Sequence, residues 1–279
     1  MANATGKHID KTFLSINQAE ERGFIHRDYI AHCLRWSHVI KYMSEGQKYK
    51  HAQVLDVGCG REAPMATMLH SSRMAPAGYI GIDYGPIDRH AEFKGAFKPQ
   101  FIPNSDFADT EFDKKFDVIT CFEVLEHVEP DHSKRILEGI RDHLLVDGCA
   151  FLSTPCWNKV DCAANHVNEM TYEALGAMIE DSELEVLKTY GTFASMRDYV
   201  HRMTKEQSSV FEGLREYYDV NVISCLFAPL FPEYSRNALW VVKKSTNNTT
   251  RRFKCLSEVK APWSSSQVKA PWSSSQVNK

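Results

Sequence analysis

Two glutamates and a histidine lie close together in the segment FEVLEHV, at Glu123, Glu126 and His127. If this segment begins a helix, the spacing i, i+3 and i+4 places the three side chains on one face. Two carboxylates and an imidazole on one face can bind a divalent metal ion, and His166 in the later loop CWNKVDCAANHVNEMT offers a fourth ligand. The candidate metal ligands are Glu123, Glu126, His127 and His166.

The same residues also fit interpretations without a metal. Glu126 can cap a helix while His127 packs or hydrogen-bonds to nearby backbone, and either His127 or His166 can act as a general base. Further on, Glu169 and Thr171 are typical of the start of a helix, because threonine is a favoured N-cap residue. The candidate catalytic residues are Glu123, His127 and His166.

A glycine turn follows a short apolar run in AQVLDVGCG. The run ends in Asp56, and Gly58 and Gly60 allow a tight turn at which a ligand can approach the backbone closely. Two features argue against a dinucleotide. Pro64 stands where a helix carrying a third glycine would pack, and Asp56 would repel a pyrophosphate but attract a cationic amino-acid group.

Two further acids follow the next two predicted strands. Asp83 in GIDYG lies 25 residues beyond Gly58, about where such folds place an acid on ribose hydroxyls. Asp106 in NSDF offers an acceptor for an adenine amino group, with Phe107 flanking the ring. Each aspartate alone is typical of an ordinary loop or cap. Three acids at successive strand ends indicate one binding edge.

These residues require a sheet whose strand ends meet at one edge. Short apolar runs alternate with amphipathic helical segments, which is typical of a parallel sheet covered on both faces. Strands are predicted in AQVLDV and over 78–83, 100–103, 116–122, 149–154, 184–190 and 238–242. Helices are predicted over 27–42, in PMATMLHSS, and over 133–145 and 172–180. The fold class is therefore α/β and doubly wound.

The chain is expected to divide into three parts around this sheet. They are an N-terminal helical segment over 1–50, a main domain over 51–244 and a flexible tail over 245–279. Within the main domain, residues 191–237 are too long for a hairpin and show helical periodicity, which predicts a helical cap. The tail repeats VKAPWSSSQ at 259–267 and 268–276, too short for a stacked solenoid, so it is a flexible extension or a short motif presented twice.

At these motifs the sequence resembles the class I S-adenosylmethionine-dependent methyltransferase family, from about residue 53 to residue 243. VLDVGCG is similar to its first motif, GIDYG to its second, NSDF to its third and FDVITCFEVLEHV to its fourth, although Glu62 stands where many members have a further glycine. The resemblance implies a Rossmann-like, mostly parallel sheet of seven strands and S-adenosylmethionine as the cofactor. The implied cofactor contacts are Asp56, Gly58, Gly60, Asp83, Tyr84, Asp106, Phe107 and Phe122.

The ExxEH segment resembles that of metal-dependent O-methyltransferases, notably the small-RNA 3′-terminal 2′-O-methyltransferases and the ubiquinone-biosynthesis O-methyltransferases. There an ExxEH helix and a later histidine hold a metal ion against vicinal hydroxyls, and Glu123, Glu126, His127 and His166 match that pattern residue by residue. Mg²⁺ or Mn²⁺ at this place would lower the pKa of the acceptor hydroxyl and orient its oxygen. Many family members carry a similar segment without a metal role, so both interpretations remain.

Net charge and hydropathy limit only the broad class of acceptor and the location of the protein. A net charge of -3 provides no overall positive field for nucleic acid or acidic membranes, and no run approaches the ~20 apolar residues of a membrane span. We therefore expect a cytoplasmic enzyme that O-methylates a small-molecule or nucleotide-like acceptor, of unknown oligomeric state. One alternative is an RNA or modified-nucleic-acid methyltransferase, and another is a catalytically silent cofactor-binding or interaction protein. The first alternative requires a basic surface, for which the candidates are Arg27, Arg35, Lys41, Lys48 and Lys50.

Overall fold

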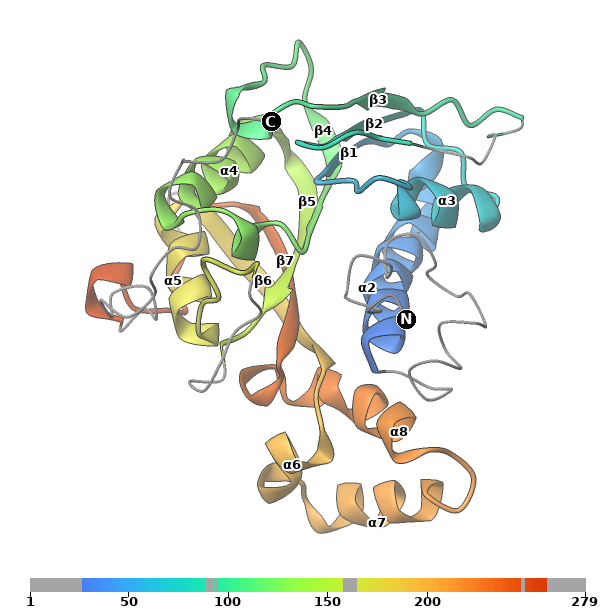
Figure 1. The fold of residues 1–279 in the computed structure, drawn as a ribbon, viewed down its shortest axis with the longest axis vertical. Helices are drawn as coiled ribbons and strands as arrows, with labels where there is room; N and C mark the ends of the chain where they lie inside the picture. Colours follow the sequence, from blue (N-terminus) through green and yellow to red (C-terminus); the bar gives the residue numbers. More distant parts are fainter. Residues whose placement is uncertain (1–26, 89–92, 94, 158–164, 247–248, 260–279) are drawn as a thin grey trace, which may run out of the picture.

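A computed structural model describes residues 27–88, 93, 95–157, 165–246 and 249–259 (Figure 1). In these residues, seven strands form one sheet in the order β3-β2-β1-β4-β5-β7-β6. The strands are β1 (Gln53–Val57), β2 (Gly78–Ile82), β3 (Gln100–Ile102), β4 (Phe116–Phe122), β5 (Leu144–Pro155), β6 (Leu184–Phe193) and β7 (Asn237–Lys244). Strand β7 runs antiparallel to both β5 and β6, and the other pairs are parallel. The expected doubly wound, mostly parallel seven-stranded sheet is confirmed.

Helices cover both faces of the sheet (Figure 1). The covering helices are α2 (Arg27–Ser44) and α3 (Pro64–Ser71) on one face, and α4 (Pro130–His143) and α5 (Tyr172–Asp181) on the other. Successive side chains of β1 alternate between the two cores. Val54 belongs to the cluster that contains Trp36 of α2, whereas Leu55 belongs to the cluster that contains Ile136 of α4. This burial on both faces explains why the strand sequences are nearly continuous apolar runs.

The segment after β4 differs from the expectation. Glu123 does not begin a helix, because its φ is +56°, and only Leu125–His127 forms a short 3-10 turn, η4, before α4 begins at Pro130. A proline fits the first turn of a helix but not the interior, where its missing N–H and its ring would break the hydrogen-bond ladder. The prediction that Glu123 shares a helical face with Glu126 and His127 is therefore wrong.

A helical insertion separates β6 from β7, as predicted, and lies at the bottom of Figure 1. It contains α6 (Met196–Tyr199), α7 (Lys205–Leu214) and α8 (Val220–Phe227). The insertion packs tightly on the end of β6, because a Cβ at Gly191 would lie 1.9 Å from Ser235 Oγ. Inside it, the rings of Tyr199 and Phe231 stack with centroids 4.7 Å apart. No helix among the described ranges has the length and hydropathy of a membrane span.

Part of the segment expected to be a flexible tail is docked on α5. The backbone N–H of Phe253 donates to Glu180 Oε2 at 2.8 Å, and its ring packs on Tyr172 and Trp240. A Cβ at Gly176 would lie 2.5 Å from that ring, so α5 needs a glycine there to admit it. The duplicated VKAPWSSSQ lies outside the described residues, apart from Val259.

Candidate functional site

The turn after β1 is fixed by hydrogen bonds to the backbone of β2 and to the acid that directly follows β2, Asp83. Gly58 N donates to Ile82 O at 2.9 Å, and Gly60 N donates to Asp83 Oδ2 at 2.8 Å. The φ angles of Gly58 and Gly60 are +66° and +74°, in the left-handed region that favours glycine. A Cβ at Gly58 would lie 2.2 Å from Val124 Cγ2. The glycine turn therefore also contacts the segment after β4.

Hydrogen bonds to Asp83 also join the segments that follow β2 and β3. Ser105 N donates to Asp83 O at 3.0 Å, while Asp83 Oδ1 accepts from Gly85 N at 2.8 Å. Asp106 caps the 3-10 turn η3 (Phe107–Asp109), because its Oδ1 accepts from Ala108 N at 2.9 Å. The structure thus brings the glycine turn, Asp83 and Asp106 to one edge of the sheet, where a nucleoside could contact all three.

Asp56 lies beneath this edge rather than at its surface. Its side chain is only 3% exposed, and its two oxygens accept hydrogen bonds from Tyr79 Oη and Thr120 Oγ1, each at 2.6 Å. The geometry does not favour the expected direct contact with a cationic group, because the carboxylate is buried and already accepts hydrogen bonds from side chains of β2 and β4. Burial raises the pKa of Asp56 to about 6 despite these hydrogen bonds.

Asp56 should make stability depend on pH. Because its pKa is raised on folding, the stabilisation is fully present below the unfolded pKa of 3.8 and is lost as the pH rises through about 6. A rise from 3.8 to about 6 corresponds to at most about 3 kcal/mol. Urea unfolding should show that the free energy of unfolding falls more steeply between pH 4 and pH 7 in the wild type than in Asp56→Asn. Parallel pH profiles of the two proteins would contradict this role.

The three aromatic candidates occupy very different positions. Phe107 is 5% exposed and packs into the core against α4, where Gly139 leaves room for its ring, so its expected place beside an adenine ring is wrong. The side chain of Tyr84 is 82% exposed at the end of β2. Phe122 is half-buried at the end of β4, with the Arg35 guanidinium 6.0 Å from its ring centroid. Tyr84 and Phe122 remain candidates to contact a ligand.

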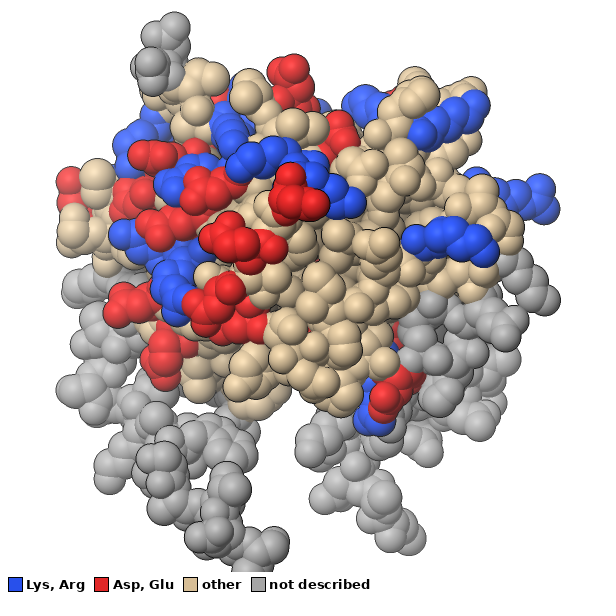
Figure 2. All heavy atoms as spheres, turned by 90° about the horizontal axis from the view of Figure 1, so that it is seen from above, with Lys and Arg blue, Asp and Glu red and all other residues tan. Residues whose placement is uncertain are grey.

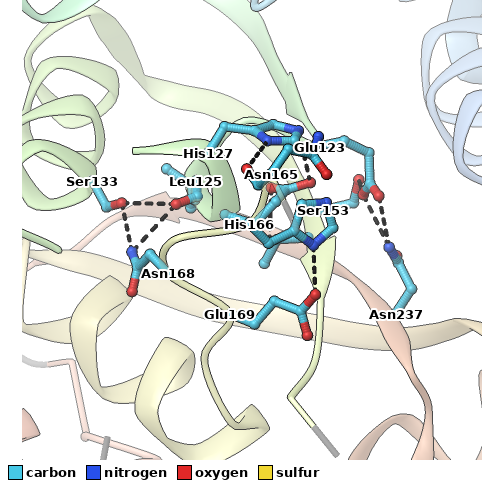
Figure 3. A network of polar contacts seen from close by, with 12 residues as sticks. Glu123, Leu125, His127, Ser133, Ser153, Asn165, His166, Asn168, Glu169 and Asn237 are labelled. Atoms are coloured by element: carbon cyan, nitrogen blue, oxygen red, sulfur yellow. Dashed lines mark hydrogen bonds and ion pairs between the residues drawn. The ribbon is translucent and has the colours of Figure 1, made fainter. Parts of the chain in front are cut away.

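Glu126, His127 and His166 converge on one point, although about 40 residues separate the first two from the third. The two imidazoles lie close to each other (Figure 3). One ligand atom from each lies within 4.8 Å of the other two. The loop after β5 reaches η4 because Val167 N and Asn168 N donate to Glu126 O, at 2.8 and 3.1 Å. Three of the four predicted metal ligands are therefore brought together by backbone hydrogen bonds.

Hydrogen bonds orient both imidazoles of this cluster. His127 Nδ1 lies 3.1 Å from Asn165 O, and His166 Nδ1 lies 2.5 Å from Glu169 Oε1 (Figure 3). A carbonyl oxygen only accepts hydrogen bonds, so the proton of His127 is on Nδ1 and its lone pair is on Nε2. The Glu169 carboxylate favours the same arrangement in His166. Glu169 was interpreted from the sequence as part of a helix start, and the HxxE spacing was the signal for its contact with His166.

The carboxyl group of Glu126 is deeply buried. Its side chain is 1% exposed, and Thr154 Oγ1 donates to its Oε2 at 2.9 Å. The pKa of Glu126 is raised well above its usual range, mainly by burial and secondly by the negative charge of the nearby Glu123. His127 Nε2 lies 3.8 Å from Glu126 Oε1. A cation at this place would stabilise the ionised carboxylate.

Glu123 belongs to a different network. Arg35 Nη1 lies 2.6 Å from Glu123 Oε1, Ser153 Oγ donates to the same oxygen at 2.9 Å, and Asn237 Nδ2 donates to both oxygens at 3.0 Å. The metal-ligand cluster does not include Glu123. Its expected role as a ligand is therefore not supported by the geometry. Instead it ties α2, β5 and β7 to the end of β4.

The nucleic-acid alternative requires a basic surface, and the contact between Arg35 and Glu123 removes one of its candidate residues. Arg35 is 2% exposed, so this predicted surface residue is buried against Glu123. Lys48 Nζ lies 3.9 Å from the Tyr42 ring centroid, which assigns it a local partner. On the face shown in Figure 2, Lys and Arg side chains are interspersed with Asp and Glu and form no continuous basic patch in the described residues.

The sheet order, the antiparallel β7 and the glycine turn at the edge of β1 define a class I S-adenosylmethionine-dependent methyltransferase. The chain belongs to the methyltransferase domain family, whose model matches residues 26–189. The family membership agrees with the resemblance of its motifs to S-adenosylmethionine-dependent methyltransferases.

Several curated proteins are similar to this chain. A ubiquinone biosynthesis O-methyltransferase from Glaesserella parasuis is 36% identical over 116 residues, which cover 37% of this chain and 44% of the relative. Another from Pasteurella multocida is 34% identical over 139 residues, 42% of this chain and 54% of the relative. The chain thus spans about half the length of the curated relatives it matches.

Solved structures share the fold at low sequence identity. The SAH-bound magnesium protoporphyrin IX methyltransferase from Synechocystis is 12% identical, covering 86% of this chain and 100% of that chain, with a TM-score of 0.52. An S-adenosylmethionine-dependent methyltransferase from Clostridium acetobutylicum is 12% identical, covering 85% and 99%, with a TM-score of 0.50. These similarities establish the fold alone.

Proposed function

We propose that this enzyme O-methylates a hydroxyl group of a small-molecule or nucleotide-like acceptor, assisted by a divalent metal ion at Glu126, His127 and His166. The observation that carries the proposal is the convergence of these three side chains beside the glycine turn, which Val124 contacts. The name of the relatives, ubiquinone biosynthesis O-methyltransferase, supports transfer to oxygen. Asp83 and Asp106 are proposed to bind the ribose hydroxyls and the adenine amino group of the cofactor.

The donor set fits a divalent ion. One carboxylate and two imidazoles leave open coordination positions on a first-row divalent ion. Both imidazoles have hydrogen-bonded Nδ1 atoms, the arrangement that prepares Nε2 for a metal. Burial raises the pKa of Glu126, and a neighbouring cation would oppose this shift by stabilising the ionised carboxylate. Because imidazole is a softer ligand than carboxylate, we expect Mn²⁺ to bind more tightly than Mg²⁺.

Methyl transfer is an in-line displacement, in which the acceptor oxygen bonds to the methyl carbon while the carbon–sulfur electron pair returns to sulfur. The main task of the protein is therefore to position the two reactants. The glycine turn holds the donor, and the contact of Gly58 with Val124 fixes the distance from that turn to η4. A bound divalent ion would lower the pKa of the acceptor hydroxyl and so ease the loss of its proton. The helical insertion and α2 are proposed to cover the acceptor.

A second candidate mechanism is general-base catalysis without a metal. The observation that favours it is the contact of 2.5 Å between His166 Nδ1 and Glu169 Oε1, which would orient His166 Nε2 to accept the hydroxyl proton. The two mechanisms differ in their response to a chelator, because only the first loses activity when divalent ions are removed.

The acceptor is tested with methyl-labelled S-adenosylmethionine and a matched panel of acceptors. The panel contains a catechol, the corresponding phenol and aniline, and a ribonucleotide with a free 2′,3′-diol. We expect label in an acceptor with vicinal hydroxyls and at least tenfold less in its single-hydroxyl counterpart, because two oxygens can share one ion. Transfer to the aniline alone, or equal transfer to catechol and phenol, would contradict the proposal.

A further inference from the structure

His132 is in the first turn of α4 and reaches back to the loop after β3. Its Nε2 lies 3.2 Å from Asp106 Oδ1 and 3.2 Å from Asp106 Oδ2. The side chains are 25% and 23% exposed, so both sit at the border between solvent and the core. Since the carboxylate only accepts hydrogen bonds, His132 Nε2 carries a proton and donates across both oxygens.

This contact holds the Asp106 carboxylate from a second side. Oδ1 already accepts from Ala108 N at 2.9 Å, and the imidazole bridges from Oδ1 to Oδ2. The carboxylate plane is thereby fixed by one backbone donor and one ring donor. A carboxylate has about four lone-pair positions, so Oδ2 keeps capacity for a further donor.

The fixed carboxylate lies beside the cofactor edge. Its loop is joined to β2 through Ser105 N, which donates to Asp83 O at 3.0 Å, and Asp83 in turn accepts from Gly60 N. If the ribose of a bound adenosine contacts Asp83 after β2, its base lies near Asp106, in the loop that follows β3. The exocyclic amino group of adenine donates hydrogen bonds, whereas a 6-oxo purine presents a carbonyl oxygen that a carboxylate repels.

We propose that His132 is a positioning residue that makes the cofactor site selective for a 6-amino purine, by holding Asp106 Oδ2 toward the amino group. The inference rests on the proposed assignment of Asp106 to the adenine. Without His132 the carboxylate keeps only the Ala108 N–H donor on Oδ1, so Oδ2 gains freedom and becomes hydrated, and ordering it again opposes binding. Helix α4 would thereby contribute to cofactor recognition through a side chain that none of the cofactor motifs contains.

The test compares two ligands by calorimetry, S-adenosylhomocysteine and S-inosylhomocysteine, which differ at the 6-position of the purine. In His132→Ala, affinity for S-adenosylhomocysteine should fall about tenfold, the effect of one hydrogen bond to a charged group, while affinity for S-inosylhomocysteine changes less than about twofold. His132→Gln, which keeps an N–H donor, should recover part of the loss. Thermal unfolding of each variant verifies the fold.

Arg135 provides the matched control. It lies one turn further along α4 and pairs with Asp109 instead of Asp106, so Arg135→Ala should leave both affinities within about twofold. An equal loss for both ligands in His132→Ala, or no loss, would overturn the inference. Asp106→Asn separates this failure from failure of the adenine assignment. If Asp106→Asn alters the preference and His132→Ala does not, only His132 is misassigned, whereas no change in either variant removes Asp106 from the base site.

Discussion

Replacement of Glu126 by glutamine is expected to lower kcat by about three orders of magnitude, the effect of losing several kcal/mol of metal-ion assistance. The amide keeps the volume of the side chain and can still accept from Thr154 Oγ1, which lies 2.9 Å from Glu126 Oε2. It lacks the negative charge that a divalent ion requires. Initial rates with the acceptor at saturation measure the effect, and affinity for S-adenosylhomocysteine should stay within about threefold of wild type.

Glu129 offers the control for this substitution. It carries the same functional group three residues later, but its side chain is exposed and makes no cap hydrogen bond to α4. Glu129→Gln should therefore retain wild-type kcat. Calorimetry with Mn²⁺ provides a second readout, because Glu126→Gln should lose binding that Glu129→Gln keeps. Unchanged kcat and unchanged Mn²⁺ affinity in Glu126→Gln would remove Glu126 from the site.

Gly58→Ala is expected to weaken binding of S-adenosylhomocysteine by at least a hundredfold. The new Cβ would lie 2.2 Å from Val124 Cγ2, and the φ of +66° is strained for alanine. A left-handed alanine costs about 1–2 kcal/mol, and overpacking adds about 1–3 kcal/mol, so the loop must leave its binding geometry. Val124 immediately precedes η4, and so the displacement should also reach the metal ligands and reduce kcat. Calorimetry and initial rates measure the two effects.

Two further variants define the cause of this loss. Gly213→Ala in α7 is the control, because nothing lies within 4 Å of the Cβ it would introduce, and it should bind like wild type. Adding Val124→Ala to Gly58→Ala should recover the part of the affinity that the clash removes, but not the part due to the backbone angle. Wild-type affinity in the single variant Gly58→Ala would show that the cofactor lies elsewhere.

The sheet and its glycine turn were predictable from local sequence. Buried parallel strands are recognisable as short apolar runs, and the two glycines after β1 adopt the positive φ angles that the turn suggested. Strand ends were less predictable. Strand β5 begins at Leu144 rather than at residue 149, because Leu144 pairs with Phe116 across a register shift that no local pattern indicates.

The candidate site was only partly predictable, because most of its contacts join distant parts of the chain. The carboxylate of Glu123 was assigned by spacing, yet Asn237 lies 114 residues away and Arg35 belongs to a separate helix. The ion pair with Arg35 and the hydrogen bonds from Asn237 hold the Glu123 carboxylate outside the cluster that contains Glu126. The buried position of Phe107 likewise depends on Gly139, which an isolated NSDF motif does not reveal.

Metal-assisted transfer is tested most directly by one titration. Enzyme treated with EDTA is assayed with labelled S-adenosylmethionine and the best acceptor of the panel while Mn²⁺ is added in steps. The expected result is a rate at least a hundredfold below that of untreated enzyme in EDTA, recovered along a saturable curve with Mn²⁺. A full rate in EDTA that added Mn²⁺ does not change would contradict the metal site at Glu126, His127 and His166, and would leave general-base catalysis by His166 as the mechanism.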